Sequence, residues 1–333
     1  MFNYSFFVGI DVSKALIDIS YYLNGDVIYL GQYGNSKKDF QLIFDDLSNL
    51  TSCPIDHWFV CFENTGAYSK DLFYWLIAQG VPCREENALK ISLSLGLRRG
   101  KNDKIDSQDI CNYAFEKRDK IQPSEAPNSM IIKLKCLLSR RDLLVKHRTA
   151  LKVSLKEQKS SLEDYFYSEL EETNVEMIKY YDKQIKALED SIQQVIKSDP
   201  AAAKNNKLLQ SIVGIAKVTS AFLIATTNNF KSFTDSRKYA CYCGIAPFSK
   251  SSGIKKGKSK VNHMANKKMK SLLSNGAISA IVHDPEISLY FKRKIKEGKD
   301  EGVVYNAVKN KLIHRAFAVI RRQTPYVQMM KYA

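Results

Sequence analysis

The chain has 333 residues, 44% of them hydrophobic and 26% charged, which is typical of a globular protein with two or three domains. No apolar stretch approaches the roughly 20 residues that cross a bilayer, and the N-terminus lacks a signal-peptide pattern, so we expect a cytoplasmic protein. The net charge is +16, and residues 207–333 alone hold 24 Lys and Arg against 6 Asp and Glu. A region this basic favours a polyanion, most often nucleic acid, over a merely solvated surface.

The first 86 residues show the pattern of an α/β domain. Near-continuous apolar runs predict buried strands, and apolar residues at helical spacing predict helices between them. The predicted elements are strands over 6–11, 15–23 and 27–33, a helix over 36–50, a strand over 57–63, a helix over 71–79 and a short strand over 81–84. This order is typical of a ribonuclease-H-like fold, in which acidic residues gather at the ends of the first and fourth strands and on a later helix.

Four acidic residues stand where a metal-dependent phosphoryl-transfer site would place them. Asp11 ends the first predicted strand and Glu63 ends the fourth. Asp103 and Asp106 are three residues apart, so on a helix they share one face. A carboxylate at the tip of a buried strand needs a positive partner. We therefore expect these four residues to bind one or two Mg²⁺ ions, which can clamp both oxygens of a phosphate displacement.

A helical region is predicted in the middle of the chain. Glu125-Ala126-Pro127 indicates a boundary after a first domain over 1–127. Residues 130–197 contain almost no Gly or Pro and predict two long amphipathic helices. These fit an antiparallel hairpin or a coiled coil with a partner chain. The Ala- and Asn-rich segment after Asp199-Pro200 is predicted to be a linker that ends this region, residues 128–206.

The basic region, residues 207–333, begins with the pattern of two helices joined through Gly214, a helix–hairpin–helix-like unit. Glycine permits the tight turn, and amides at the start of the second helix can hold a backbone phosphate. A purely structural helix pair is the alternative. Further on, Ser252 stands beside a glycine in a lysine-rich loop. The lysines expected to contact nucleic acid are Lys217, Lys250, Lys255, Lys256, Lys258, Lys260, Lys267 and Lys268.

Five motifs in order resemble those of a known family. They are GIDVSK at 9–14, ENTGAY at 63–68, RRGKNDKID at 98–106, IVGI at 212–215, and GIAP at 244–247 followed by SSG at 251–253. Together they resemble the DEDD-type transposases of bacterial insertion sequences, the IS110 family, to which the Piv DNA invertase is related. One departure is the Lys-rich stretch 255–260, where the family often has Arg and Gly, so point charges replace bidentate contacts to phosphate.

The resemblance implies a RuvC-like (ribonuclease-H-like) α/β N-terminal domain, an α-helical coiled-coil insertion and a mainly α-helical C-terminal transposase domain. It implies a catalytic tetrad at Asp11, Glu63, Asp103 and Asp106, and a serine nucleophile at Ser252, next to Ser251. It also implies a noncoding bridge RNA that pairs with donor and target DNA. The protein would be a nucleoid-associated homo-oligomer, a dimer or a tetramer, in which acids and serine meet across protomers.

We therefore expect a recombinase that cleaves and rejoins DNA strands through Ser252, with no need for ATP. A RuvC-like structure-selective nuclease, such as a junction resolvase, is the alternative; it would use the same acids with water as nucleophile. A nucleic-acid-binding scaffold is disfavoured because all four acids are present. Arg98, Arg99 and Lys101 precede Asp103 and are expected to contact phosphate, a solvated charge run being the competing view.

Overall fold

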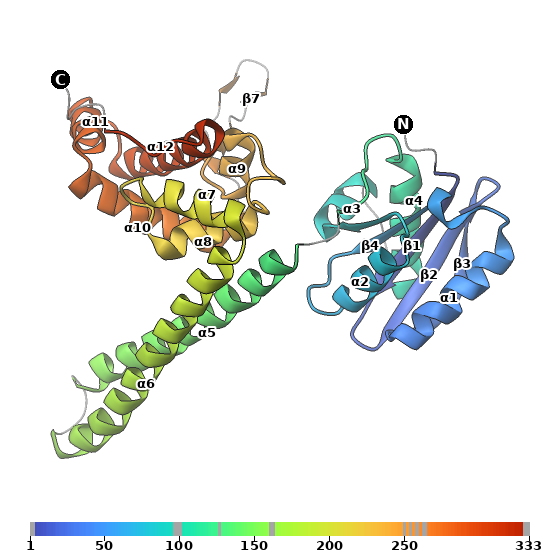
Figure 1. Cartoon of the computed structure of the whole chain (residues 1–333), viewed down its shortest axis with the longest axis horizontal. Helices are drawn as coiled ribbons and strands as arrows, with labels where there is room; N and C mark the ends of the chain where they lie inside the picture. Colours follow the sequence, from blue (N-terminus) through green and yellow to red (C-terminus); the bar gives the residue numbers. More distant parts are fainter. Residues whose placement is uncertain are drawn as a thin grey trace. The chain divides into compact units, whose positions relative to one another are not determined.

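The computed structural model describes residues 4–95, 102–125, 128–159, 164–248, 251–252, 255–256, 260–261 and 265–328. The chain forms two compact units, Met1–Ala126 and Pro127–Ala333 (Figure 1). The three-domain division predicted from the sequence stays a prediction, since it subdivides the second unit by function. Among the described helices, none has the length and apolar character that a membrane span requires.

The first unit is built on a mixed five-stranded sheet in the order β3-β2-β1-β4-β5. Its strands are β1 (Phe6–Val12), β2 (Leu16–Leu23), β3 (Asp26–Gly34), β4 (Trp58–Glu63) and β5 (Cys83–Glu86). The first three strands pair antiparallel as a meander, and β1, β4 and β5 run parallel. This sheet is consistent with the predicted ribonuclease-H-like α/β fold.

Helices cover both faces of the sheet, because side chains along a strand point alternately to its two sides. Phe6, Val8 and Ile10 of β1 pack into one core with α1 and α2. Phe7 lies on the other face, in a core with α3 and α4. The central strands β1 and β4 are therefore apolar along nearly their whole length. The helices are α1 (Lys37–Leu50), α2 (Lys70–Ala78), α3 (Ala88–Leu95) and α4 (Asp103–Glu116).

Local sequence signals explain where these elements begin and end. The Ser36 hydroxyl accepts a hydrogen bond from the backbone N–H of Asp39, which confirms the predicted start of α1. Gly80 follows α2 with a left-handed φ of 71°, which confirms the predicted end of that helix. Asn102 caps α4 by accepting from the N–H of Ile105 at 2.8 Å. The cap therefore fixes the first turn of α4.

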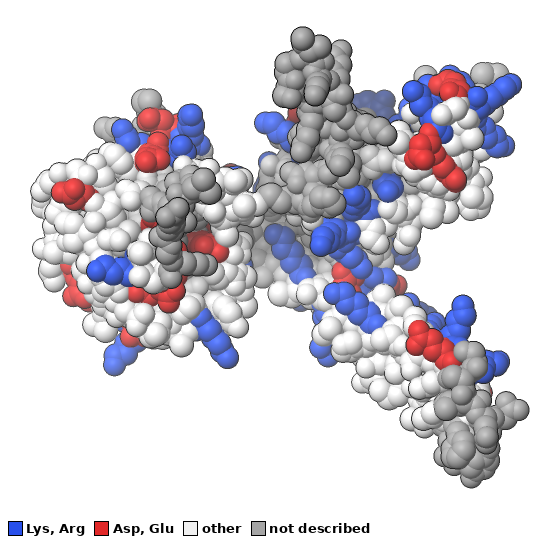
Figure 2. All heavy atoms as spheres, turned by 180° about the vertical axis from the view of Figure 1, so that it is seen from behind, with Lys and Arg blue, Asp and Glu red and all other residues white. Residues whose placement is uncertain are grey.

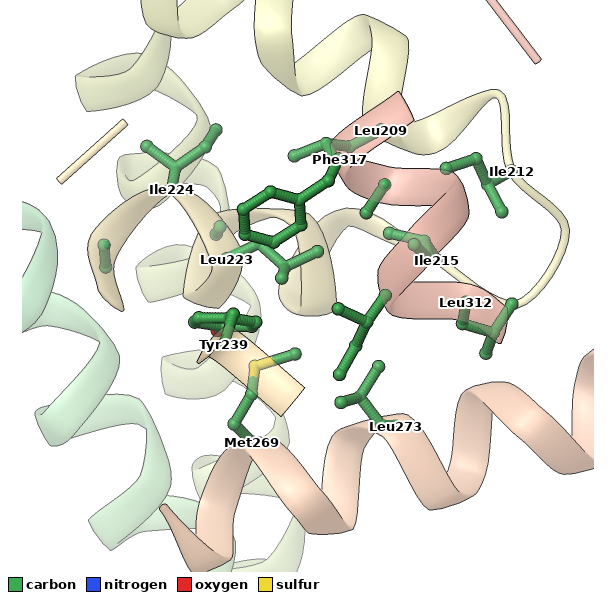
Figure 3. Close-up of a cluster of buried hydrophobic side chains, with 14 of the residues drawn as sticks. Leu209, Ile212, Ile215, Leu223, Ile224, Tyr239, Met269, Leu273, Leu312 and Phe317 are labelled. Atoms are coloured by element: carbon green, nitrogen blue, oxygen red, sulfur yellow. The ribbon is translucent and has the colours of Figure 1, made fainter. Parts of the chain in front are cut away.

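The second unit is mainly α-helical, with four two-residue strands among the residues described between α9 and α10. Its helices are α5 (Ser129–Gln158), α6 (Asp164–Lys197), α7 (Pro200–Gln210), α8 (Lys217–Thr226), α9 (Ser236–Tyr242), α10 (Lys267–His283), α11 (Pro285–Lys296) and α12 (Glu301–Arg322). Figure 3 shows the core in which Leu209, Leu223, Tyr239, Leu273 and Leu312, from five different helices, point toward one another. This core gives the second unit its own source of stability.

α5 and α6 form a long helical hairpin (Figure 1). Arg141 pairs with Glu189 at 2.6 Å, and Arg148 pairs with Asp182. Seven residues forward on α5 therefore correspond to seven residues backward on α6, so the two helices run antiparallel. The hairpin expected from the sequence is present within one chain. The coiled coil with a partner chain stays a prediction.

The segment after Asp199 is a helix, and the prediction of a linker there was wrong. Asp199 Oδ1 accepts the N–H of Ala202 at 2.9 Å, and Pro200 stands at the helix start, where a missing N–H is tolerated. An Asp-Pro pair predicts a break in the chain, but the same pair can also start a helix, which the following alanines favour. Leu208 and Leu209 of α7 are buried in the core, so this segment is part of the second unit's structure.

Candidate active site and nucleic-acid surface

A close approach between β1 and α4 positions the acidic residues. Gly9 has no side chain, and a Cβ there would lie 2.3 Å from the backbone N of Cys111 and 2.4 Å from the carbonyl O of Ser107. The hydroxyls of Ser107 and Ser20, 2.8 Å apart, also hydrogen-bond α4 to β2. α4 therefore rests directly on the sheet at Gly9, and its first turn reaches the end of β1.

Three carboxylates converge at this end of β1. Asp11 lies two residues after Gly9 and therefore on the same face of the sheet. Asp103 and Asp106 belong to the first turn of α4. One oxygen atom from each of these three carboxylates lies within 4.8 Å of those from the other two. Asp11 and Asp106 are half-buried and Asp103 is exposed, so the group opens to solvent on one side.

The sheet register extends this group into a row of acids. Asp18 of β2 pairs directly with Asp11. The parallel register of β1 and β4 places Glu63 beside Asp11 on the other side, and Glu63 pairs with Glu86 of β5. Four neighbouring strands thus each contribute one carboxylate at the same level, on the face that α4 covers. The two acids in the middle of the row, Asp11 and Glu63, belong to the predicted tetrad. Each of them therefore has an acidic neighbour on both sides.

The two outer acids are held by donors from the protein. Tyr29 Oη donates to Asp18 Oδ1 at 2.6 Å, and Gln32 Nε2 donates to Asp18 Oδ2 at 3.0 Å. Glu86 has a mixed set of partners: Lys90 Nζ at 3.1 Å, Arg84 Nε at 3.4 Å, Tyr113 Oη at 3.3 Å and the N–H of Asn87 at 3.0 Å. Both outer acids are buried. Their hydrogen bonds and ion pairs compensate the loss of water that this burial imposes.

The inner carboxylates repel one another. Burial, followed by the charges of Asp106, Glu63, Asp103 and Asp18, raises the pKa of Asp11 from 3.8 to about 6. A carboxyl group with a raised pKa, in a cluster of like charges, is typical of a site that acts on a ligand. The electrostatics therefore favour a cation among these residues.

The donor set fits a divalent cation with oxygen ligands. Mg²⁺, Ca²⁺ and Mn²⁺ take carboxylate oxygens, and the three converging residues supply only such atoms. A bound cation would also remove the repulsion that raises the pKa of Asp11. Asp11, Asp103 and Asp106 are the residues that would hold it, with Glu63 beside them in the sheet register.

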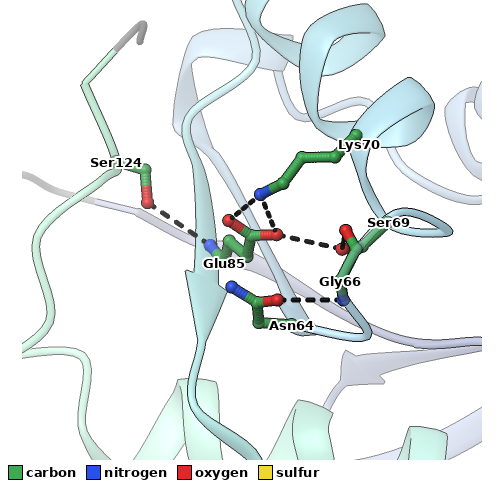
Figure 4. Close-up of polar contacts among 6 residues, drawn as sticks. All are labelled: Asn64, Gly66, Ser69, Lys70, Glu85 and Ser124. Carbon is green, nitrogen blue, oxygen red and sulfur yellow. Dashed lines mark hydrogen bonds and ion pairs between the residues drawn. The ribbon is translucent and has the colours of Figure 1, made fainter. Parts of the chain in front are cut away.

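A polar network fixes the loop that follows β4 (Figure 4). Asn64 Oδ1 accepts the N–H of Gly66 at 3.0 Å. Ser69 Oγ donates to Glu85 at 2.9 Å, and Lys70 Nζ contacts both oxygens of the same carboxylate at 2.7 Å. The network ties the start of α2 to β5. It therefore holds in place the chain segment that leaves the acidic row.

Ser252 belongs to the second unit, in a short antiparallel ladder rather than an irregular loop. Ser251–Ser252 (β7) pairs with Lys255–Lys256 (β8), and Ser252 is opposite Lys255. A second ladder joins Pro247–Phe248 (β6) to Lys260–Val261 (β9). The pairing thus places the backbone of Ser252 next to that of a lysine pair; β7 is labelled in Figure 1.

Several predicted contacts to nucleic acid lie outside the described residues. These are Arg98, Arg99, Lys101, Lys250 and Lys258. Lys255, Lys256 and Lys260 belong to the ladders β8 and β9. No statement about phosphate contact follows from the structure for any of them, so their role stays a prediction.

Gly214 joins α7 to α8, as the helix–glycine–helix pattern predicts. Its φ is +94°, and a Cβ there would lie 2.4 Å from the carbonyl O of Gly276 on α10. The glycine therefore serves the packing of the core. Lys217 begins α8 and is exposed, and Ala216 at the N-cap supplies no side-chain cap to the amides there. A phosphate contact at this helix start stays a prediction.

The start of α10 carries two of the predicted lysines in different settings. Lys268 pairs with Asp142 of α5 at 2.6 Å and lies over the ring of Phe222. Lys267 is exposed. Figure 2 shows Lys and Arg side chains spread over the unit of residues 127–333, whereas acidic and basic side chains are mixed on the other unit. In this view most of the Lys and Arg side chains belong to the second unit, which contains 38 of the chain's 51 Lys and Arg residues.

Sequence reasoning missed Asp18 and Glu86 as members of the acidic row. Asp18 stands between Ile17 and Ile19, inside an apolar strand, where an acid is unusual. An acid inside an apolar strand could therefore have indicated that Asp18 belongs to the site. Glu86 lies beyond the predicted end of its strand at Arg84, so its register with β4 could not be seen from the pattern.

Two family models match the chain. Residues 8–167 match the model of the DEDD transposases of IS110, described as "Transposase". Residues 206–292 match a model described as "Transposase IS116/IS110/IS902 family". The first match includes all four acids that the sequence analysis singled out, and the second includes Gly214 and Ser252.

The chain is also similar to curated proteins. It is 29% identical over 273 residues to the pilin gene-inverting protein of Moraxella lacunata, covering 79% of this chain and 80% of that protein. The pilin gene-inverting protein of Moraxella bovis gives the same values. An IS110 insertion element protein of Streptomyces coelicolor is 27% identical over 148 residues, which cover 44% of this chain and 36% of that protein.

Proposed function

Because the chain belongs to the IS110 family of transposases, whose members cut and rejoin DNA, we propose that it does so through Ser252 and the acidic cluster of its first unit. The observation that carries this proposal is the convergence of Asp11, Asp103 and Asp106, with Glu63 beside them. The inversion of a gene by the Moraxella relatives supports rejoining as well as cleavage.

The four acids form the part of the site that accepts the phosphate. We propose that Asp11, Glu63, Asp103 and Asp106 together hold one or two Mg²⁺ ions. When bound, such ions supply positive charge to the phosphoryl oxygens and to the attacking and leaving oxygens. Without a cation these acids would repel the DNA backbone, as they already repel one another at Asp11.

Ser252 is the proposed nucleophile. Its Oγ attacks the phosphorus, the bond from phosphorus to the 3′ oxygen breaks, and the proton lost by the hydroxyl is balanced by the one gained at the free 3′ end. The product is a phosphoserine link to the 5′ end of the fragment downstream of the break, and the upstream fragment leaves with the free 3′ hydroxyl. A 3′ hydroxyl from the exchanged strand then attacks that link, restores the phosphodiester and returns the serine. No energy from a nucleotide is required.

Nucleic-acid binding is assigned mainly to the basic part of the chain. Residues 207–333 carry 24 Lys and Arg against 6 Asp and Glu, which suits phosphate contacts more than base reading. This supports the proposal that a bridge RNA supplies sequence choice by pairing with donor and target DNA. We also propose a homo-oligomer, a dimer or a tetramer, in which the acids of one protomer act with the serine of another.

The proposal is tested by trapping the covalent link. DNA with the natural flanks of the coding region is labelled at its 3′ ends, because the cut leaves the 5′ phosphate on the protein. It is incubated with Mg²⁺, with and without RNA transcribed from the same flanks. The wild-type protein should give a labelled protein band on a denaturing gel, and Ser251→Ala should retain it. Ser252→Ala should lose the band and keep DNA binding.

Other results would change the assignment in defined ways. Cleavage without any labelled protein would favour the alternative, a RuvC-like nuclease that uses water. A band that survives in Ser252→Ala but disappears in Ser251→Ala would move the nucleophile by one residue. Cleavage that persists in Asp106→Asn would remove the acids from the mechanism. Cleavage that is equal with and without RNA would remove the guide.

A further inference from the structure

A pocket of about 450 Å³ lies at the edge of the first unit's sheet, next to the acidic row. Its wall comes from β5, α3, and the end of α4 with the turn that follows. The residues that line it are Arg84, Glu86, Lys90, Ser94, Tyr113, Lys117, Lys120, Ile121 and Gln122. Its size is within the range of pockets that bind small ligands or one segment of a larger one.

The pocket concentrates positive charge in a unit that is otherwise acidic. Residues 1–126 hold 13 Lys and Arg against 17 Asp and Glu. Four of those 13 basic residues line this one pocket, together with a single acid, Glu86. Basic residues that serve only to keep a surface solvated would not need to gather in one pocket. The pocket therefore suits an anion.

The negative charge of the single acid in the pocket is already compensated by basic neighbours. Burial tends to raise the pKa of Glu86, but the N–H of Asn87 and the charges of Arg84 and Lys90 lower it below 4.5. The carboxylate thus stays ionised and holds Arg84 and Lys90 at the wall. Arg84 Nε is buried and has no hydrogen-bond acceptor of good geometry among the described residues. One donor of the wall is therefore left unsatisfied.

Two lysines of the pocket are available to a ligand. Lys117 follows the last turn of α4 and is half-buried, and Lys120 is exposed. Within the described part of the chain, neither forms an ion pair. Arg84 and Lys90 line the same pocket. A phosphate group could accept hydrogen bonds from several of them at once.

The pocket stands at a fixed spacing from the acidic row. Glu86, which lines it, pairs with Glu63, and Glu63 is beside Asp11 in the register of β1 and β4. Two strand spacings, about 10 Å, therefore separate β5 from Asp11 on β1. Measured along the axis of a duplex, this corresponds to about three nucleotides of one strand at 3.4 Å each. A strand at the acids can thus reach the pocket without a bend.

We propose that this pocket binds a backbone phosphate of the DNA strand that is cut, a few nucleotides from the scissile phosphate. The inference rests on the proposed function, because it takes the acidic row as the place of cleavage. The pocket would orient the strand over the row, since the acids themselves repel DNA. DNA is favoured over RNA as the occupant because the pocket adjoins the acidic row, where cleavage is proposed to occur.

The salt dependence of DNA binding tests the proposal without any cleavage. The probe is a mixed-sequence DNA duplex with a fluorophore, measured by anisotropy with the full-length protein in EDTA. In Lys117→Gln/Lys120→Gln, the slope of log K against log salt should decrease by about 0.9, since the loss of one phosphate contact removes about that much. Charge reversal in Lys117→Glu/Lys120→Glu should lower the affinity further. Thermal unfolding should be unchanged in both.

Lys37→Gln/Lys38→Gln is the matched control, because these exposed lysines begin α1 on the opposite face of the sheet. Its salt slope should equal that of the wild type. Equal slopes in the pocket variant and the wild type would overturn the pocket assignment while leaving the cleavage mechanism intact. A loss seen with an RNA duplex of the same sequence, but not with DNA, would overturn DNA as the occupant. Wild-type protein that binds no DNA at all would instead contradict the proposed function.

Discussion

The two units of this protein divide charge and architecture between them. The first is an α/β unit in which residues 1–126 hold 13 basic against 17 acidic residues, and the second is a helical unit in which the remaining residues hold 38 against 18. The acidic cluster that could hold cations lies on the first, and most of the positive surface lies on the second. The comparison therefore separates the candidate cation site, in the first unit, from most of the positive charge, in the second.

Both units depend on a glycine that lets a helix approach other backbone closely. In the first it is Gly9 of β1, against which α4 packs, and in the second it is Gly214, against α10. Only the first of these contacts also positions acids of the candidate site. Comparing a substitution of Gly9 with one of Gly214 therefore distinguishes a loss of stability within a unit from a loss of site geometry.

The largest effect is expected from Gly9→Ala. The new Cβ would lie within 2.3 to 2.7 Å of three backbone atoms of α4, so the helix must move away, at a cost of about 3 kcal/mol. Hydrogen exchange followed by mass spectrometry should show amides of β1 and α4 exchanging roughly a hundredfold faster, because 1.4 kcal/mol corresponds to a factor of ten. DNA cleavage should be lost, because α4 carries two of the four acids.

Gly214→Ala is the counterpart in the other unit. The Cβ would meet the carbonyl O of Gly276 at 2.4 Å, and the φ of +94° adds strain, so a similar cost of about 3 kcal/mol is expected. Faster exchange should appear in α7, α8 and α10 and leave β1 and α4 unchanged. Gly80→Ala is the control for the strain alone, since its φ of +71° is also left-handed but its Cβ would meet nothing within 4 Å. Exchange that rises across both units in either variant would contradict their independence.

Periodicity and caps predicted much of the first unit. Ser36 before an amphipathic stretch gave the start of α1, and apolar runs that end in Asp11 and Glu63 gave the central strands. These signals are local, so a single sequence contains them. Five motifs in order, two of them around these acids, also gave the family, which the two family models confirm.

Signals that depend on packing could not be read from the sequence. The register that brings Asp18 and Glu86 into the acidic row is set by strand pairing, which joins residues far apart in the chain. The role of Gly9 depends on the contact with α4, nearly a hundred residues later. The basic pocket combines residues of β5, α3 and α4, so no single stretch contains it. The prediction of a linker after Asp199-Pro200 was wrong for another reason. The same pair of residues can either interrupt a helix or start one.

A smaller effect, of opposite sign, is expected from Asp11→Asn in the metal-free protein. The pKa of Asp11 is raised to about 6 in the folded state, so its charge destabilises the fold, and stability decreases as the pH rises from about 4 to about 6. Because the carboxyl is only half-buried, screening reduces the effect to about 1 kcal/mol. At pH 7.5 in EDTA the variant should therefore resist urea more than the wild type, and it should lose cleavage activity.

The pH dependence and the cation provide the checks on this prediction. The difference in unfolding free energy should shrink toward zero near pH 4, where Asp11 is protonated in the folded state. Mg²⁺ should stabilise the wild type and have little effect on the variant. Asp26→Asn, which changes an exposed acid at the start of β3, should alter neither. A variant less stable than the wild type at pH 7.5 would show that Asp11 is not repelled by its neighbours.

The smallest effect concerns the helical hairpin of the second unit. Arg141 is largely buried and contacts Glu189 at 2.6 Å, but the glutamate is more exposed, so the pair should stabilise the hairpin by only about 0.5 kcal/mol. Glu189→Gln and Arg141→Gln should each lower the melting temperature of this unit by about 1 to 2 °C, and the exchanged pair Arg141→Glu/Glu189→Arg should recover part of the loss. If α5 and α6 instead packed against a partner chain, melting would depend on protein concentration and the exchange would recover nothing. The measurement thus decides between the two arrangements that the apolar stripes of these helices allow.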